Sequence, residues 1–260
     1  MCLLIIGWNV HPRFRLVVAA NRDEFHARPA APLAKWPPPG EILAGRDIQA
    51  GGTWLGVDRH RRVGVVTNFR DMQPPRPGAR SRGELIPSFL TGSSTPQEFM
   101  TALEARASEY SGFNLLLADA QELWYASNRA QPFARRLPPG VYGLSNHFLD
   151  TPWPKLARVR RKFEQWLQTA DGSSDELFAM LNDREPPDPV EPLDASGRLP
   201  AELVRAISAP FVLHPEYGTR CSTVVRLGHA GTLDIIEHRF NPAGALNGET
   251  EFHLNETEWP

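Results

Sequence analysis

The chain has 260 residues, of which 41% are hydrophobic and 22% are charged, and its formal charge at neutral pH is −2. This composition is ordinary for a folded globular protein, and the length suits one large domain or two small ones. The nearly balanced charge gives no electrostatic reason to expect binding to nucleic acid or to an anionic membrane. Two cysteines are too few for a disulfide scaffold or a cysteine-based zinc site.

The N-terminal apolar run ends at Trp8 and has no positively charged leader, so we do not expect a secretory signal. No segment approaches the roughly 18–20 consecutive apolar residues that a membrane span requires. We therefore expect a cytoplasmic protein without a membrane span.

The predicted elements begin with two short apolar runs, 3–8 and 16–20, which are typical of antiparallel strands. Because both runs are apolar on successive residues, we expect this sheet to be buried on both faces. A proline-rich loop follows to about Glu41, and residues 53–57 and 63–67 then predict a hairpin.

Two helices are predicted next, at 83–90 and from Thr95 to about 108, with Ser94 or Thr95 as the N-cap of the second. The rest of the chain predicts, in order, a hairpin of 113–118 with 122–127, a strand at 141–145, an amphipathic helix at 154–168, a helix at 175–181, a loop at 183–200 and a hairpin of 221–227 with 233–238.

The strands come as hairpins, and the helices are grouped after them instead of alternating with them. This order favours an α+β fold with an antiparallel sheet over a parallel, doubly wound sheet. Strands that are apolar on both faces need cover on both sides, which favours helices layered over two sheets. We find no internal repeat and no strong domain boundary, so residues 1–260 are expected to form a single domain.

Cys2 opens the first predicted strand, and its small side chain favours removal of the initiator methionine. It would then carry an α-amine with a reference pKa of about 7.7–8.0 beside a thiol with a reference pKa of about 8.5. An N-terminal nucleophile that is activated by its own amine is a known catalytic arrangement. The alternative interpretation is a buried strand residue.

Four polar residues, Asn21, Arg22, Asp23 and Glu24, directly follow the second predicted strand, beside the strand that carries Cys2. An arginine near the thiol would lower its pKa, and a carboxylate could hold the α-amine. The alternative is a solvated turn with an Arg–Asp ion pair.

The glycine-rich segment 51–56 combines flexible backbone with Thr53 and Trp54, and it suits either a substrate-lining segment or a bulged strand entry. Asn68 and Asn146 each end a predicted strand. An asparagine amide can hold an oxyanion, although asparagine is also a common turn residue.

Arg220 enters the last predicted hairpin, where it could bind a carboxylate or polarise a thiol. We expect the adjacent Cys221 to be a buried strand residue, because a Cys2–Cys221 disulfide is disfavoured in a reducing compartment. The eight histidines show no metal-ligand spacing, so no metal site is expected. One of them, or Cys2, nevertheless has the chemistry of an axial haem ligand.

Several motifs together resemble the NRDE family, also called the Transport and Golgi Organization protein 2 family. The resemblance runs nearly end to end and rests on Met1-Cys2, on Leu16 to Phe25, and on the runs 28–29, 51–56, 67–68, 81–85, 112–115, 142–146, 151–155 and 217–220.

That family is in turn remotely similar to N-terminal-nucleophile hydrolases of the choloylglycine hydrolase and penicillin V acylase type. The resemblance implies a four-layer αββα sandwich and a cysteine amidohydrolase that acts on a non-peptide C–N amide bond. It implies these roles: Cys2 as nucleophile with its amine as base, Arg22 as the site arginine, Asp23 as the amine partner, Asn68 and Asn146 as oxyanion and amine-positioning groups, and Arg220 as a late arginine near the nucleophile.

One departure concerns the segment from Asn21 to Glu24. The hydrolases separate their arginine and aspartate by two residues, whereas Arg22 and Asp23 are adjacent. A gapless alignment would put Asn21 at the arginine position and Glu24 at the aspartate position. Adjacent strand residues point to opposite faces, so Arg22 and Asp23 cannot both face Cys2 if the strand continues through them. Asn21, Glu24, Thr53 and Trp54 are therefore kept as candidate substrate-binding residues.

The resemblance also implies a second class of function, because members of the family are associated with haem mobilisation and with lipid or acyl-CoA homeostasis. We also expect four tryptophans near the proposed site, namely Trp8, Trp36, Trp54 and Trp153. We expect no required cofactor, and a small-molecule ligand that is an amide, haem or an acyl-CoA.

Overall fold

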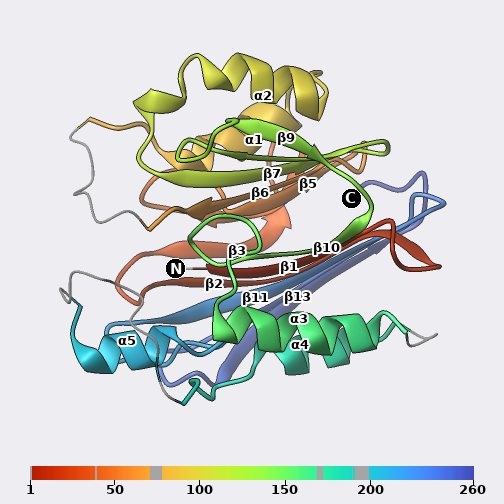
Figure 1. The fold of residues 1–260 in the computed structure, drawn as a ribbon. Coiled ribbons are helices and arrows are strands. Elements are labelled where there is room, and N and C mark those ends of the chain that lie inside the picture. The colour runs from red at the N-terminus through yellow and green to blue at the C-terminus, as the bar shows by residue number, and fades with distance from the viewer. Residues whose placement is uncertain (1, 39, 71–77, 169–171, 189, 191–198) are drawn as a thin grey trace. The chain divides into compact units, whose positions relative to one another are not determined.

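The computed structural model describes residues 2–38, 40–70, 78–168, 172–188, 190 and 199–260 (Figure 1). These residues form a mixed α/β structure with two antiparallel sheets and five α-helices. The predicted antiparallel pairing is therefore confirmed. The chain divides into two compact units, one of Met1–Ala27, Pro139–Ser145 and Leu149–His253, and one of Arg28–Pro138, Asn146–Phe148 and Leu254–Pro260.

The first unit contains a six-stranded antiparallel sheet in the order β10-β1-β2-β11-β12-β13. Its strands are β1 (Cys2–Trp8), β2 (Phe14–Phe25), β10 (Gly140–Leu144), β11 (Tyr217–Gly228), β12 (Leu233–Phe240) and β13 (Leu246–Leu254). Its helices are α3 (Pro154–Trp166), α4 (Ser174–Leu181) and α5 (Ala201–Ile207). Helix α3 packs on β10 and β1, while α4 packs on β2 and β11.

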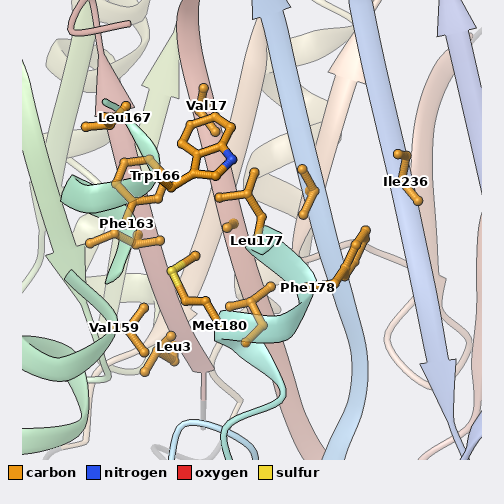
Figure 2. Close-up of a cluster of buried hydrophobic side chains, with 14 of the residues drawn as sticks. Leu3, Val17, Val159, Phe163, Trp166, Leu167, Leu177, Phe178, Met180 and Ile236 are labelled. Carbon is orange, nitrogen blue, oxygen red and sulfur yellow. The ribbon is translucent and has the colours of Figure 1, made fainter. Parts of the chain in front are cut away.

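The core of this unit is built from every second residue of β1 and β2. Leu3 and Val17 point toward the helices and belong to the same buried cluster as Phe163 of α3 and Leu177 of α4 (Figure 2). Each such side chain contributes about 1.5–3 kcal/mol through burial. The intervening residues, such as Leu4, are buried as well, which confirms the expectation that both faces of these strands are buried.

The second unit contains a seven-stranded antiparallel sheet whose strands follow the chain order from β3 to β9. These are β3 (Ala30–Lys35), β4 (Ile42–Asp47), β5 (Leu55–Asp58), β6 (Val63–Asn68), β7 (Phe113–Ala118), β8 (Leu123–Ser127) and β9 (Ala134–Leu137). The helical segments are η1 (Arg82–Glu84), α1 (Leu85–Leu90), α2 (Pro96–Glu104) and η2 (Ala107–Glu109). Helix α1 packs on β5 and β6, and α2 packs on β8 and β9, so one face of this sheet carries a helical layer.

Helix α2 begins as predicted, with Thr95 as its N-cap and Pro96 in its first turn. The N–H of Glu98 donates to the Thr95 hydroxyl at 3.2 Å, and the Thr95 N–H donates to the Glu98 carboxylate at 2.9 Å. This reciprocal pair satisfies two backbone donors that the first helical turn leaves without partners.

Several elements differ from those predicted. Strand β2 continues to Phe25, so residues 21–24 lie inside the strand and not after it. The region assigned to a proline-rich loop contains β3, while β4, α5, β9 and β13 were not predicted. The predicted loop at 183–200 lies partly outside the described residues, and its described part contains no helix or strand.

Two of the missed strands, β3 and β13, have a weak apolar pattern. Strand β3 contains Pro32 and buries fully only Leu33, and β13 alternates between exposed and half-buried residues along its whole length. Both strands lie at the edges of their sheets, where proline and polar side chains are tolerated.

Two of the glycine-containing motifs meet in the second unit. The N–H of Thr53 donates to the carbonyl of Gly83 at 3.0 Å, and a Cβ built on Gly52 would overlap the Gly83 backbone. Gly51 has a positive φ of 75° but open space around it. The glycine at position 52 is therefore required by a close backbone crossing, and the one at 51 by its conformation.

Replacing Gly52 with alanine should therefore cost about 3 kcal/mol of unfolding free energy, because two backbone segments must separate. The matched Gly51→Ala change should cost only about 1 kcal/mol, the penalty of a left-handed alanine. Urea unfolding of both variants measures the difference. Equal losses would contradict the close-crossing account.

Candidate functional site

Three neighbouring strands set the geometry around Cys2. Cys2 on β1 lies directly opposite Arg22 on β2, and Arg22 lies opposite Cys221 on β11. Directly opposed residues of antiparallel strands project to the same face, so these three side chains form a row on one face of the sheet. Leu3 and its partner Asn21 project to the other face, toward the helices.

Within this row, Arg22 lies between the two cysteines. Neither Cys2 nor Cys221 forms a disulfide, and β2 lies between the strands that carry them. Two strand spacings amount to about 9–10 Å, which exceeds the roughly 7 Å limit between the Cα atoms of a disulfide. A Cys2–Cys221 bridge would therefore require the strands to move.

The thiol of Cys2 is partly buried. Burial raises its pKa above the ordinary value, and the negative charge of Asp23 adds to this effect. The backbone N–H of Asp23, which donates to the sulfur, and the guanidinium of Arg22 act in the opposite direction. Because the net pKa shift is upward, the thiol stays protonated at neutral pH and needs a proton acceptor before it can act as a nucleophile.

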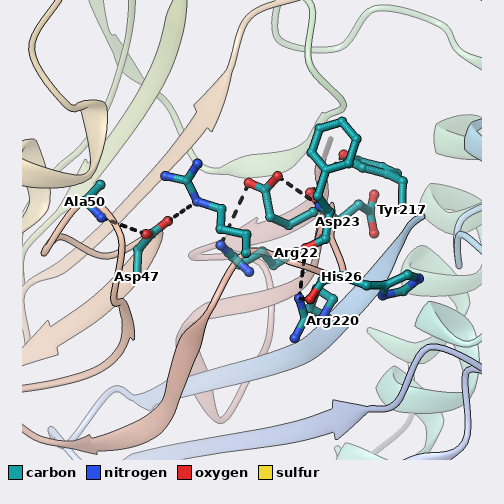
Figure 3. Close-up of polar contacts among 10 residues, drawn as sticks. Arg22, Asp23, His26, Asp47, Ala50, Tyr217 and Arg220 are labelled. Atoms are coloured by element: carbon teal, nitrogen blue, oxygen red, sulfur yellow. Dashed lines mark hydrogen bonds and ion pairs between the residues drawn. The ribbon is translucent and has the colours of Figure 1, made fainter.

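Arg22 shares the face that carries Cys2, and Glu24, two residues further along β2, projects to the same face. Figure 3 shows the polar contacts around Arg22. The Nη2 atom of Arg22 and the Oε2 atom of Glu24 lie 3.8 Å apart, and the arginine side chain is only 6% exposed. Arg220 on β11 extends its side chain to the end of β2, where its Nη1 donates to the carbonyls of Phe25 at 2.9 Å and His26 at 3.1 Å. Burial and the nearby charge of Arg22 lower the pKa of Arg220.

Asp23 projects to the opposite face and is buried. It accepts a hydrogen bond of 2.7 Å from the Thr219 hydroxyl. Burial raises the pKa of Asp23 from 3.8 to about 6, although Lys155, the Thr219 hydrogen bond and Arg22 each lower it. Asp23 is thus a carboxyl group whose charge depends on its neighbours near neutral pH.

Asn21 is fully engaged in packing on the helix face. Its Nδ2 donates to the carbonyls of Leu181 and Pro210, both at 2.9 Å, and its Oδ1 accepts from the Ser222 hydroxyl at 2.6 Å. These bonds give Asn21 a structural role. The register favours Arg22, and not Asn21, as the residue that shares a face with Cys2.

The remaining candidates belong to the second unit. The Asn146 Nδ2 donates to the carbonyl of Asn68 at 2.8 Å, and Asn146 has a positive φ of 56°. Thr53 directs its hydroxyl to the carbonyl of Leu55 at 2.9 Å, and the Trp54 ring lies against Gly45. The structure thus brings Asn68 and Asn146 together within this unit.

Three buried polar residues near these candidates were not predicted from the sequence. Thr219 and Lys155 act on Asp23 in the first unit, and Asn114 donates to the carbonyl of His147 at 3.0 Å in the second. Each belongs to a motif that carries the family resemblance. Of these three residues, Lys155 offered the clearest sequence signal of a role outside its helix, because a cation in the first turn interacts unfavourably with the helix dipole.

Within the described ranges, no group of three or more histidine, cysteine, aspartate or glutamate side chains is arranged to hold a metal ion. None of the described helices is long and apolar enough to cross a membrane.

The raised pKa of Asp23 predicts a pH-dependent stability. The folded state binds this proton more tightly than the unfolded state, so stability falls as pH rises from about 4 to about 6. A shift of this size corresponds to a loss of about 3 kcal/mol. Asp23→Asn removes the charge, so urea unfolding from pH 4 to pH 7 should show the variant gaining stability relative to the wild type.

Asp183→Asn is the matched control. Burial raises the pKa of Asp183, but Lys162, the Glu185 N–H and Arg158 outweigh it, so the net pKa is lowered. This variant should lose stability relative to the wild type as pH rises, which is the opposite sign. An Asp23→Asn variant that follows the wild-type pH dependence would refute the assignment.

Comparison with known proteins identifies the family of the chain. A family model described as Transport and Golgi organisation 2 matches residues 1–242. The Transport and Golgi organization protein 2 homolog of Bos taurus is 33% identical over 274 residues, covering 97% of this chain and 98% of that protein. The Homo sapiens homolog is 34% identical over 270 residues, covering 96% and 97%, and the Drosophila melanogaster protein is 24% identical over 276 residues, covering 95% and 96%. The chain therefore belongs to the Transport and Golgi organisation 2 family.

Proposed function

We propose that the chain is an N-terminal-nucleophile-type cysteine amidohydrolase that cleaves a linear, non-peptide C–N amide bond. The observation that carries this proposal is the register of β1 against β2, in which Cys2 opposes Arg22 at the start of its strand. Once Met1 is removed, the freed α-amine lies at the start of β1. Arg22 is the partner of Cys2 on β2, and Asp23 directly follows Arg22. A carboxylate there can hold the amine.

The reaction needs no cofactor. The Cys2 thiol gives its proton to the neutral α-amine, and Sγ bonds to the amide carbonyl carbon of the substrate. The C–N bond then breaks, and the leaving amine takes the proton from the α-ammonium. Water attacks the thioester with the α-amine as general base, which releases a carboxylic acid and restores the thiol.

The raised pKa of the thiol supports an amine-assisted mechanism. A preformed thiolate is not available at neutral pH, whereas an α-amine has a reference pKa of about 7.7–8.0 and accepts a proton there. Arg22 shares the face of the thiol and lowers its pKa, so it favours the charged form that develops during attack.

Further roles in the proposal come from the family resemblance. It assigns Asn68 and Asn146 to the oxyanion and to positioning the amine, and Arg220 to the surroundings of the nucleophile. Glu24, Thr53 and Trp54 remain proposed substrate-binding residues. A reducing compartment such as the cytoplasm suits the reaction, because it keeps the thiol reduced.

We also propose that residues 1–260 form a single domain of the four-layer αββα type. Each compact unit supplies one antiparallel sheet with a helical layer on one face, which is half of such a sandwich. The chain also enters each unit more than once, which supports folding as one body.

The intact mass of the purified protein should lack Met1, and incubation with p-nitrophenyl acetate should add one acetyl group at Cys2. The mature residue carries both the thiol and the amine that acts as general base, so the acetyl group should then be lost by hydrolysis. Mass spectrometry with peptide mapping measures both steps.

Cys221→Ala is the matched control, because it removes the buried thiol on the other side of Arg22 and should leave acylation unchanged. Cys2→Ala should fold normally and remain unmodified. A wild-type protein that retains Met1 or does not acylate would contradict the proposed function.

A competing proposal is a haem- or acyl-CoA-handling protein on the same scaffold. One histidine favours it: burial and the nearby Arg70 lower the pKa of His147, so its imidazole is neutral. The rings of Phe69 and Phe148 lie 5.1 and 4.8 Å from it, and Phe148 is exposed. A neutral imidazole beside aromatic rings has the chemistry of an axial haem ligand.

This competing proposal predicts saturable changes in the Soret absorbance when haem is added to the wild-type protein. His147→Ala should weaken them, whereas substitution of the exposed His60 should not. Titration without saturation, together with no acyl-CoA binding by calorimetry, would rule the proposal out.

A further inference from the structure

A cluster of buried polar side chains lies on the helix face of the six-stranded sheet, beside the start of β1. Its members are Asp23 on β2, Thr219 on β11 and Lys155 on α3, and each is no more than 3% exposed. Buried polar groups of this kind are costly unless they satisfy one another. None of these three is explained by helix or strand formation alone.

The hydroxyl of Thr219 accepts one hydrogen bond and donates another. It accepts a hydrogen bond of 2.9 Å from the Val212 N–H, and it donates one of 2.7 Å to the Asp23 carboxylate. A hydroxyl has a single proton, so accepting from Val212 directs that proton toward Asp23. The N–H of Thr219 also donates to the Val212 carbonyl at 3.0 Å, which fixes the backbone on either side.

Lys155 reaches the same cluster from the first turn of α3. Its Nζ donates to the carbonyl of Ile207 at 2.8 Å, and its charge lowers the pKa of Asp23. An ammonium group at the N-terminus of a helix opposes the helix dipole, and a buried lysine is rare without a charged neighbour. The position of Lys155 is therefore explained by Asp23 and not by α3.

The other titratable or charged side chains that act on Asp23 are Arg22 on its own strand and Cys2 on β1. Arg22 projects to the opposite face of β2, whereas Lys155 of α3 acts on Asp23 from the helix face.

We infer that Lys155 and Thr219 are positioning residues that hold the Asp23 carboxylate ionised and oriented for the α-amine of a mature Cys2. This inference rests on the proposed function. The carboxylate stabilises the α-ammonium that forms when the thiol transfers its proton, so reactivity requires Asp23 to be charged. Loss of either partner leaves Asp23 protonated over a wider range of pH.

The test is the pH profile of Cys2 acylation by p-nitrophenyl acetate, measured on full-length protein whose mass shows that Met1 is absent. The wild-type rate should fall at low pH because the α-amine and Asp23 both gain protons, and Asp23→Asn should leave only the fall that the amine causes. Lys155→Met should move the part of this acid limb that belongs to Asp23 upward by about one pH unit, the lower end of the effect of a neighbouring opposite charge. Thr219→Val should move it in the same direction, and Lys155→Arg should restore it.

Two matched variants control for general effects on folding. Lys162→Met removes an exposed lysine of the same helix, and Thr223→Val removes a buried hydroxyl of the same strand that does not bond Asp23. Both should keep the wild-type acid limb. The ¹³Cγ resonance of Asp23 reports its titration directly, and it should move with the acid limb in each variant that folds.

The outcomes separate this inference from the proposed function. If Asp23→Asn has the same acid limb as the wild type, or if Lys155→Met and Thr219→Val leave both the limb and the ¹³Cγ titration unchanged, the positioning roles are wrong and the proposed function of Cys2 stands. If wild-type Cys2 is not acylated, both are overturned.

Discussion

The antiparallel register of β1, β2 and β11 is the constraint on which the candidate site depends. It sets Cys2, Arg22 and Cys221 in one row, and it turns Asn21 and Asp23 to the helix face. A slip of one residue would exchange the two faces of β2 and place an arginine in the apolar core. The core contacts of Leu3 with α3 and α4 therefore also fix which polar side chain accompanies the thiol.

The polar half of β2 is stable only because partners distant in sequence satisfy it. Asn21 is bonded to the carbonyls of Leu181 and Pro210, and Asp23 to Thr219. Removing one partner of such a buried group costs about 1–3 kcal/mol. These long-range bonds allow the strand to continue through four polar residues, and they leave the charge of Asp23 sensitive to its surroundings.

Local patterns predicted much of the fold and less of the site. The hairpins of β5 with β6 and β7 with β8, and the Thr95 cap, follow from nearby residues and were predicted correctly. The end of β2 was misplaced because a polar run resembles a turn until its distant partners are known. For the same reason the sequence left the roles within residues 21–24 open and did not indicate that Lys155 is buried.

The proposed chemistry depends on an α-amine of mature Cys2 that works with Asp23. Selective ¹⁵N-cysteine labelling followed by a pH titration measures the state of this nitrogen. We expect the Cys2 nitrogen to have the chemical shift of an amine, and its titration to change in Asp23→Asn. A Cys2 nitrogen with the shift of a backbone amide, coupled to a retained Met1, would show that no such amine forms.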